Sequence, residues 1–168
     1  MRPKYSHRKC NEMEKKVEQK NALAAIIRGR DYFTAFYRDD IYASQEHDIA
    51  CAMIWGLELC GILTSLVDPQ TLAEADLLAA SMEIEDVLNE NIPSNHSYEF
   101  LTSLLWCAAE HVENLAPSIA QIIRSVAEME ESSLLEGSPF PDLSEAAKDA
   151  LCQAQSEIQQ KLNCSASD

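Results

Sequence analysis

Glycine is scarce in this chain, which has four glycines in 168 residues, at positions 29, 56, 61 and 137. Loops that bind phosphates or dinucleotides need clustered glycines, and neither GxGxxG nor GxxxxGK occurs. The GxSxG, HExxH, Glu-x-x-His and CxxC patterns of common hydrolases, metal sites and redox sites are missing as well. The catalytic alternative is a site built from scattered residues such as Glu58, Glu110, His111 and Cys107, and no motif supports it. We therefore expect a protein that is not an enzyme and holds no cofactor.

Basic residues are missing from residues 39–123, a stretch of 85 residues that contains fifteen acids. The whole chain has 13 Lys and Arg against 28 Asp and Glu, a net charge of -15. Residues 1–38 hold ten of the bases and four of the acids, so this segment carries +6 and the remaining 130 residues carry −21. A surface of one sign repels itself. We expect the compensating cations to come from the N-terminal segment of the same chain, from that of a dimer mate, or from a basic partner.

A long hydrophobic run occurs at residues 49–67, where Glu58 is the one charged residue in 19. Its length is near the lower limit for a membrane span. Flanking cations set membrane topology, and the nearest one here is Arg38. We expect a buried helix and no contact with membranes. No apolar stretch of secretory length follows the basic N-terminus and no cysteine spacing indicates a disulfide framework, so the expected location is cytoplasmic.

Strict alternation of apolar and polar residues between turns is also missing, so no sheet is expected. Apolar residues recur instead at spacings of three and four, which indicates amphipathic helices. The predicted helices cover residues 11–38, with a bend or break near Gly29, and then residues 44–67, 69–89, 95–115, 117–136 and 142–162. The fold class is therefore all-α, a single-domain bundle of five to six helices with a basic N-terminal helix.

Local signals place several helix ends. Asp68 is expected to cap the third helix, with Pro69 at its first position and Thr71-Leu-Ala-Glu74 as a capping box. Gly137 is expected to close the fifth helix. The chain then divides into a basic, aromatic-containing helical segment at 1–43, an acidic helical core at 44–137, and a proline linker with a C-terminal helix and frayed tail at 138–168.

Five of the eleven aromatic residues lie between Tyr32 and Tyr42. Phe33, Phe36 and Tyr37 share one helix face, and we expect that face in the core. Aromatic residues mixed with arginine can also stack on bases or anchor an interface. The residues of this segment that core packing does not account for form an alternative recognition patch, namely Arg28, Arg30, Tyr32 and Arg38.

The main functional hypothesis is a non-catalytic interaction module whose acidic surface binds a basic protein, as an inhibitor, adaptor or chaperone. Carboxylates without nearby cations can imitate nucleic-acid phosphates, so the partner could be a nucleic-acid-binding protein. The expected binding residues are Asp39, Asp40, Glu46, Asp48, Glu74, Asp76, Glu83, Glu85, Asp86 and Glu90. The alternative is a regulator that binds nucleic acid through its basic N-terminal segment and dimerises through the acidic body. Direct nucleic-acid binding is expected from no other segment.

Two histidine–cysteine pairs raise the question of a metal. His47 and Cys51 are four residues apart, as are Cys107 and His111, so each pair could supply two ligands to a tetrahedral zinc ion. In an up-and-down bundle, however, the two helices concerned run parallel, which places His47 and His111 near opposite ends. We therefore expect no metal site and interpret the cysteines as half-buried packing residues.

Overall fold

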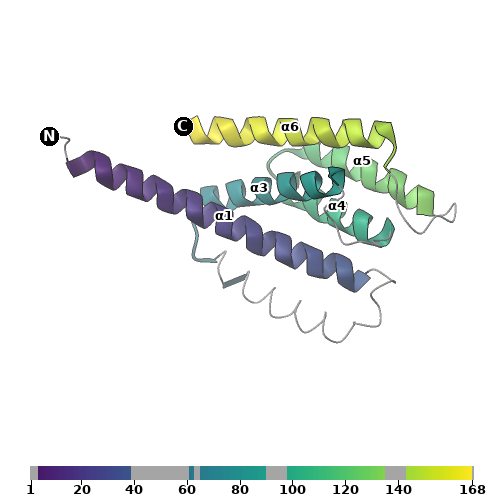
Figure 1. Ribbon diagram of the computed structural model, residues 1–168, viewed down its shortest axis with the longest axis horizontal. Helices are drawn as coiled ribbons and strands as arrows, with labels where there is room; N and C mark the ends of the chain where they lie inside the picture. The colour runs from purple at the N-terminus through teal and green to yellow at the C-terminus, as the bar shows by residue number, and fades with distance from the viewer. Residues whose placement is uncertain (1–3, 39–60, 63–64, 90–97, 135–142, 168) are drawn as a thin grey trace.

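A computed structural model describes residues 4–38, 61–62, 65–89, 98–134 and 143–167 (Figure 1). Its helices are α1 (Lys4–Arg38), α3 (Pro69–Leu88), α4 (Tyr98–Glu113), α5 (Pro117–Leu134) and α6 (Glu145–Ser167). These ranges contain no strand, which confirms the all-α class. None of the helices within them is both long and apolar enough to cross a membrane. Most of the helix expected at 44–67 lies outside the described residues.

The main core lies among α3, α4, α5 and α6 and consists of aliphatic side chains with Phe100. The buried residues of α4 and α6 recur every three or four positions, so each helix turns one apolar face inward. They are Leu101, Leu104, Leu105, Ala108 and Val112 of α4, and Ala147, Leu151, Ala154 and Ile158 of α6. Helix α1 packs on α3 and α4, whereas α6 packs on α3 and α5. Figure 1 accordingly shows α3, α4 and α5 between α1 and α6.

Helix α1 differs from the prediction in its length and in its buried face. It begins at Lys4 and continues through Gly29 without a break. A Cβ at Gly29 would meet nothing within 4 Å, so no close packing of the backbone requires glycine there. Phe33 is 39% exposed, and Tyr32 packs against the core in its place. The expectation that Phe33 faces the core was therefore wrong, because the inward face runs through Ile27 and Ala35.

Helix α3 begins as its local sequence predicts. The Asp68 carboxylate accepts hydrogen bonds from the Thr71 backbone N–H at 2.9 Å and the Thr71 hydroxyl at 2.7 Å, and Pro69 opens the helix. Because Thr71 already lies inside the helix, it does not start a capping box, and Glu74 instead accepts from Gln70 at 3.4 Å. The single cap at Asp68 satisfies the helix terminus without that second element.

Helix α6 begins one turn into the predicted segment. The backbone N–H of Ala147 donates to the Ser144 hydroxyl at 3.2 Å, so Ser144 stands at the N-terminus of the helix. The helix extends to Ser167, beyond the end expected near Leu162. Gly137 lies outside the described residues, so its expected role at the end of α5 stays a prediction.

Candidate functional site

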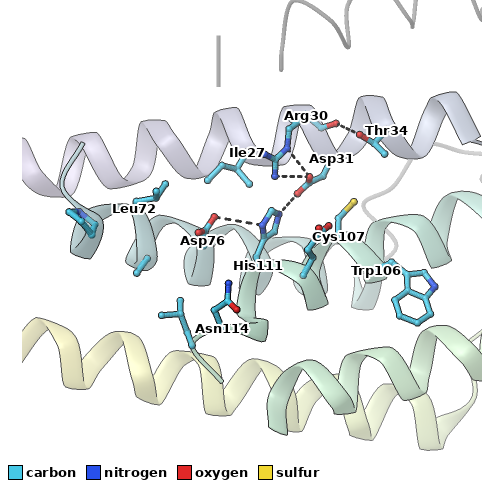
Figure 2. A pocket seen from close by; sticks show the side chains of 14 residues that line it. Ile27, Arg30, Asp31, Thr34, Leu72, Asp76, Trp106, Cys107, His111 and Asn114 are labelled. Atoms are coloured by element: carbon cyan, nitrogen blue, oxygen red, sulfur yellow. Dashed lines mark hydrogen bonds and ion pairs between the residues drawn. The ribbon is translucent and has the colours of Figure 1, made fainter. Parts of the chain in front are cut away.

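A cavity of about 640 Å³ lies between α1, α3 and α4. Figure 2 shows Asp31 and Arg30 of α1 above it, Asp76 of α3 at one side, and His111 pointing up from α4 between them. Cys107 and Trp106 of α4 and Leu72 of α3 also line the cavity. Both charged and apolar side chains, contributed by three helices, therefore line this cavity.

The centre of the site is a contact between Asp31 and His111. His111 Nε2 lies 2.6 Å from Asp31 Oδ2, and the two side chains are only 7% and 3% exposed. The other ring nitrogen, Nδ1, lies 3.6 Å from Asp76 Oδ1. Both nitrogens of the imidazole thus face carboxylates, one from α1 and one from α3.

Glu83 of α3 lies next to this pair and is 1% exposed. If Glu83 were ionised, neither of its oxygens would have a hydrogen-bond donor. Burial raises the pKa of Glu83 well above its ordinary value of 4.5, and the hydrogen bond to Asp31 and the charge of Asp31 raise it further. Burial and the neighbouring Asp31 carboxylate therefore both disfavour the ionised form of Glu83.

The two aspartates of the site respond differently to burial. Burial alone would raise the pKa of Asp31, but hydrogen bonds with Glu83 and His111 outweigh it and hold that pKa below the ordinary 3.8. For Asp76, burial is the dominant cause and raises the pKa, although His111 and Arg30 oppose it. Arg30 Nε lies 3.4 Å from Asp31 Oδ1. Asp31 is thus the carboxylate of the site that holds the negative charge most firmly.

A second polar cluster joins α1 to α3 one turn away. Arg28 Nη2 lies 2.5 Å from Asp86 Oδ2, and the Tyr32 hydroxyl donates to the same oxygen at 2.9 Å. The Tyr32 ring packs edge-on against Phe100 with ring centroids 5.8 Å apart. Burial raises the pKa of Tyr32, and the hydrogen bond to Asp86 adds to it, so the phenol stays neutral and keeps its proton for Asp86.

The structure separates the acids that were expected to form one binding surface. Glu85 is exposed, Glu74 is partly buried, and Asp76 and Asp86 are engaged by His111 and Arg28. Glu83 does not lie on the surface: it is enclosed in the core, which corrects its place in the predicted set. The remaining members lie outside the described residues, namely Asp39, Asp40, Glu46, Asp48 and Glu90.

The alternative recognition patch also divides. Arg28 and Tyr32 contact Asp86 of α3, and Arg30 contacts Asp31 of α1, so each of the three side chains is already engaged by an acid of the same chain. The side chain of Arg38 lies outside the described part of the chain. A recognition surface made of this set therefore has no support in the described contacts.

Of the two histidine–cysteine pairs, Cys107 and His111 line the cavity together, as their spacing predicts. His47 and Cys51 lie outside the described residues, so the four-residue zinc set stays untested. Glu110 lines the same cavity, which brings together three of the scattered residues considered as a catalytic alternative. The fourth, Glu58, is outside the described ranges.

Sequence reasoning missed Asp31 and Glu83 as partners of His111. Both acids interrupt apolar stripes with a spacing of four: Ile27, Asp31 and Ala35 in α1, and Ala79, Glu83 and Val87 in α3. Residues at this spacing share a helix face, so the stripes indicate buried acids. That signal was available, but it does not say which residue of another helix the acids meet.

Comparisons with protein-family models, with curated proteins and with solved structures each returned no match. The geometry and charge of the chain itself therefore carry the functional argument. A buried imidazole that lies beside carboxylates from two other helices offers nitrogen and oxygen atoms that can bind a cation.

Proposed function

We propose that this chain is a non-catalytic protein–protein interaction module whose acidic helical body binds a basic partner. The observation that carries the proposal is the scarcity of cations on that body. Three basic residues follow residue 38, and two of them already pair with acids: Arg124 Nη2 lies 2.6 Å from Glu113 Oε2, and Lys148 Nζ lies 3.6 Å from Glu145 Oε1. Among the side chains that the structure describes after residue 38, the exposed acids are Asp68, Glu85, Glu110, Glu113, Glu128, Glu145 and Asp149.

Some of the described basic side chains of α1 lie beside acids of the body at both ends of α3. Lys16 and Lys20 line a small pocket with Asp68 and Glu74 at the start of α3, and Arg28 pairs with Asp86 near its end. These contacts support the interpretation that the basic helix lies on the acidic body of its own chain. The surface left for a partner is therefore carried by acids away from those contacts, represented by Glu85, Glu110 and Asp149.

The proposal includes a cytoplasmic protein in which α1 is the basic N-terminal helix of a single-domain bundle. Its role would be that of an inhibitor, adaptor or chaperone, and a nucleic-acid-binding protein is a suitable partner because its phosphate-binding surface complements carboxylates. Self-association through α1 is the rival way of supplying cations to the body. Sedimentation of the purified chain at low and high salt distinguishes a dimer of this kind from a monomer.

The alternative function, nucleic-acid binding through the N-terminal segment, rests on a different observation. The first part of α1 extends beyond the other helices in Figure 1, and Lys15 and Lys16 on it are exposed. Deleting residues 1–20 removes this segment and retains Arg28, which pairs with Asp86 of α3. If the intact chain binds nucleic acid and the deletion does not, the alternative is correct; if the intact chain does not bind, it is excluded.

The main proposal is tested by affinity purification of the tagged chain from its native cells at low salt, followed by elution with molar salt. Interactions between exposed charges are screened within a few ångströms at that ionic strength. We expect a protein with a basic isoelectric point in the salt eluate. A partner that stays bound in molar salt, or one with an acidic isoelectric point, would contradict the proposal.

A further inference from the structure

The partner-binding proposal makes no use of the buried cluster formed by Asp31, Glu83 and His111. One ligand atom from each of these residues lies within 4.8 Å of the other two. The residues come from α1, α3 and α4, so the cluster exists only in the folded chain. One imidazole and two carboxylates form a donor set that suits divalent ions of the first transition series and zinc.

Glu83 supplies the second, independent observation. It is 1% exposed, and both of its carboxylate oxygens lack a hydrogen-bond donor. An acid in this position is costly for the fold, because an apolar residue in the stripe of Ala79 and Val87 would pack without that penalty. A cation held between Glu83 and Asp31 would give these oxygens the partner that they lack.

The surroundings of His111 match those of a metal-bound histidine. Such a ring usually directs its second nitrogen to a carboxylate, which fixes its orientation. Here Nε2 faces Asp31 and the cluster, while Nδ1 lies 3.6 Å from Asp76 Oδ1. Asp76 therefore occupies the place of the carboxylate that orients the ring, and Nε2 remains the nitrogen aimed at the ion.

The cavity provides a path to the cluster. Asp31 and His111 both line it, and its volume of about 640 Å³ is ample for a hydrated ion. Figure 2 shows the carboxylate of Asp31 and the ring of His111 in direct contact where they line the cavity. An ion entering from this side reaches Asp31 and His111 first and keeps a coordination position for water on the cavity side.

We propose that Asp31, Glu83 and His111 bind one divalent ion of the zinc or manganese class, with Nε2 of His111 and one oxygen from each carboxyl group as ligands. The site shares only His111 with the four-residue set considered from the sequence. Magnesium fits it poorly, because that ion prefers an octahedral shell of oxygen atoms. The proposed metal site does not depend on the partner.

The test uses the full chain after removal of metals with EDTA. Equilibrium dialysis against Zn²⁺, Mn²⁺ or Mg²⁺ alone, followed by elemental analysis, gives the number of ions per chain and the affinity. We expect one Zn²⁺ or Mn²⁺ per chain and weaker binding of Mg²⁺. The Asp76→Asn variant should weaken the binding of Zn²⁺ and Mn²⁺ by about 10- to 100-fold. The Glu83→Gln and His111→Gln variants should each weaken this binding more.

The matched control is Glu85→Gln, which makes the same change two residues away on the exposed face of α3. It should bind both ions like the unaltered chain. Absence of a stoichiometric ion from the unaltered chain would overturn the proposal, and so would wild-type binding by Glu83→Gln, because the ion would then be held elsewhere.

A measurement on the unaltered chain guards against variants that fail to fold. Bound Mn²⁺ is paramagnetic and broadens NMR signals of nearby protons. The ring signals of His111 should broaden before those of the three other histidines. Broadening of the other rings first would contradict the assigned ligands. Because no partner is present, failure here is distinguishable from failure of the proposed partner binding.

Discussion

His111 Nε2 on α4 lies 2.6 Å from Asp31 Oδ2 on α1, although 80 residues separate them in the chain. Both side chains are buried, so solvent screens their attraction little. Together with the Arg28–Asp86 pair, this contact fixes α1 on α3 and α4 through polar groups. Part of the apolar contribution comes from a smaller cluster in which Leu23, Ala24 and Ile27 pack on Ala75 and Ala79. Substitutions at these residues can therefore measure how much the packing of α1 on α3 and α4 contributes to stability.

Replacing Glu83 with glutamine should stabilise the protein most at high pH. The pKa of Glu83 is raised in the folded state, so its contribution is fully present below about pH 4.5 and is lost as the pH rises toward the folded value. Glutamine can still donate a hydrogen bond to Asp31 but never ionises. Thermal unfolding followed by circular dichroism should show a melting temperature that rises relative to wild type as the pH increases, by about 2–4 °C per kcal/mol gained. The control is Glu85→Gln, on the exposed face of the same helix. If the melting temperatures of wild type and Glu83→Gln depend on pH in the same way, Glu83 is not buried as described.

Replacing Asp31 with asparagine should lower the pKa of Glu83 toward its ordinary value. The charge and the hydrogen bond of Asp31 both raise that pKa, and the substitution removes the charge while burial remains. NMR titration of the Glu83 side-chain carboxyl carbon measures the shift directly. The same variant should lose about 3 kcal/mol of unfolding free energy in urea, because His111 keeps no buried carboxylate at Nε2. An unchanged Glu83 titration would contradict the influence of Asp31 on the pKa of Glu83.

Replacing Tyr32 with phenylalanine should cost about 1 kcal/mol of unfolding free energy, since the ring still packs on Phe100 and only the 2.9 Å hydrogen bond to Asp86 is lost. A double-mutant cycle with Asp86→Asn isolates that interaction in urea denaturation. The Tyr32→Phe substitution should cost less unfolding free energy in the Asp86→Asn background than in the wild type. Additive losses would mean that Tyr32 and Asp86 do not interact.

Replacing Asp68 with alanine should lower the melting temperature, because the N-terminus of α3 loses the acceptor for the Thr71 N–H and hydroxyl. Hydrogen bonds from the Thr71 backbone and side chain lower the pKa of Asp68 below 3.8. The stability that this cap contributes is therefore present above pH 3.8 and is lost as the pH falls through the folded pKa. The difference between wild type and Asp68→Ala in thermal melts should shrink in acid, whereas Asp68→Asn should retain part of the cap at every pH.

Local signals in the sequence were sufficient for the helical class and for several helix ends. The start of α3 at Pro69 after the Asp68 cap, and the start of α5 at Pro117, depend on residues within one turn of each other. The buried face of α1 was harder to predict, because Phe33 has the larger apolar side chain but Asp31 and Ala35 turn inward. The face is set by packing on α3 and α4, which a local pattern does not describe.

The candidate site was predictable only in part for the same reason. Asp31 and Glu83 interrupt apolar stripes and could have been assigned to buried faces from their spacing. Their meeting with His111 depends on the order and rotation of three helices, and no short motif encodes that arrangement. Net charge alone had placed Glu83 among the surface acids, although the same residue is enclosed in the core.

The most direct test of the proposed function is the affinity for the recovered basic partner across a range of salt concentrations. The charge-removing variant carries Glu85→Gln, Glu110→Gln and Asp149→Asn, and its control carries Glu85→Asp, Glu110→Asp and Asp149→Glu. We predict that wild type and control bind tightly at low salt and weaken steeply with added salt, while the charge-removing variant binds more weakly and depends less on salt. Equal affinities for all three proteins, unchanged by salt, would contradict an acidic surface that binds a basic partner.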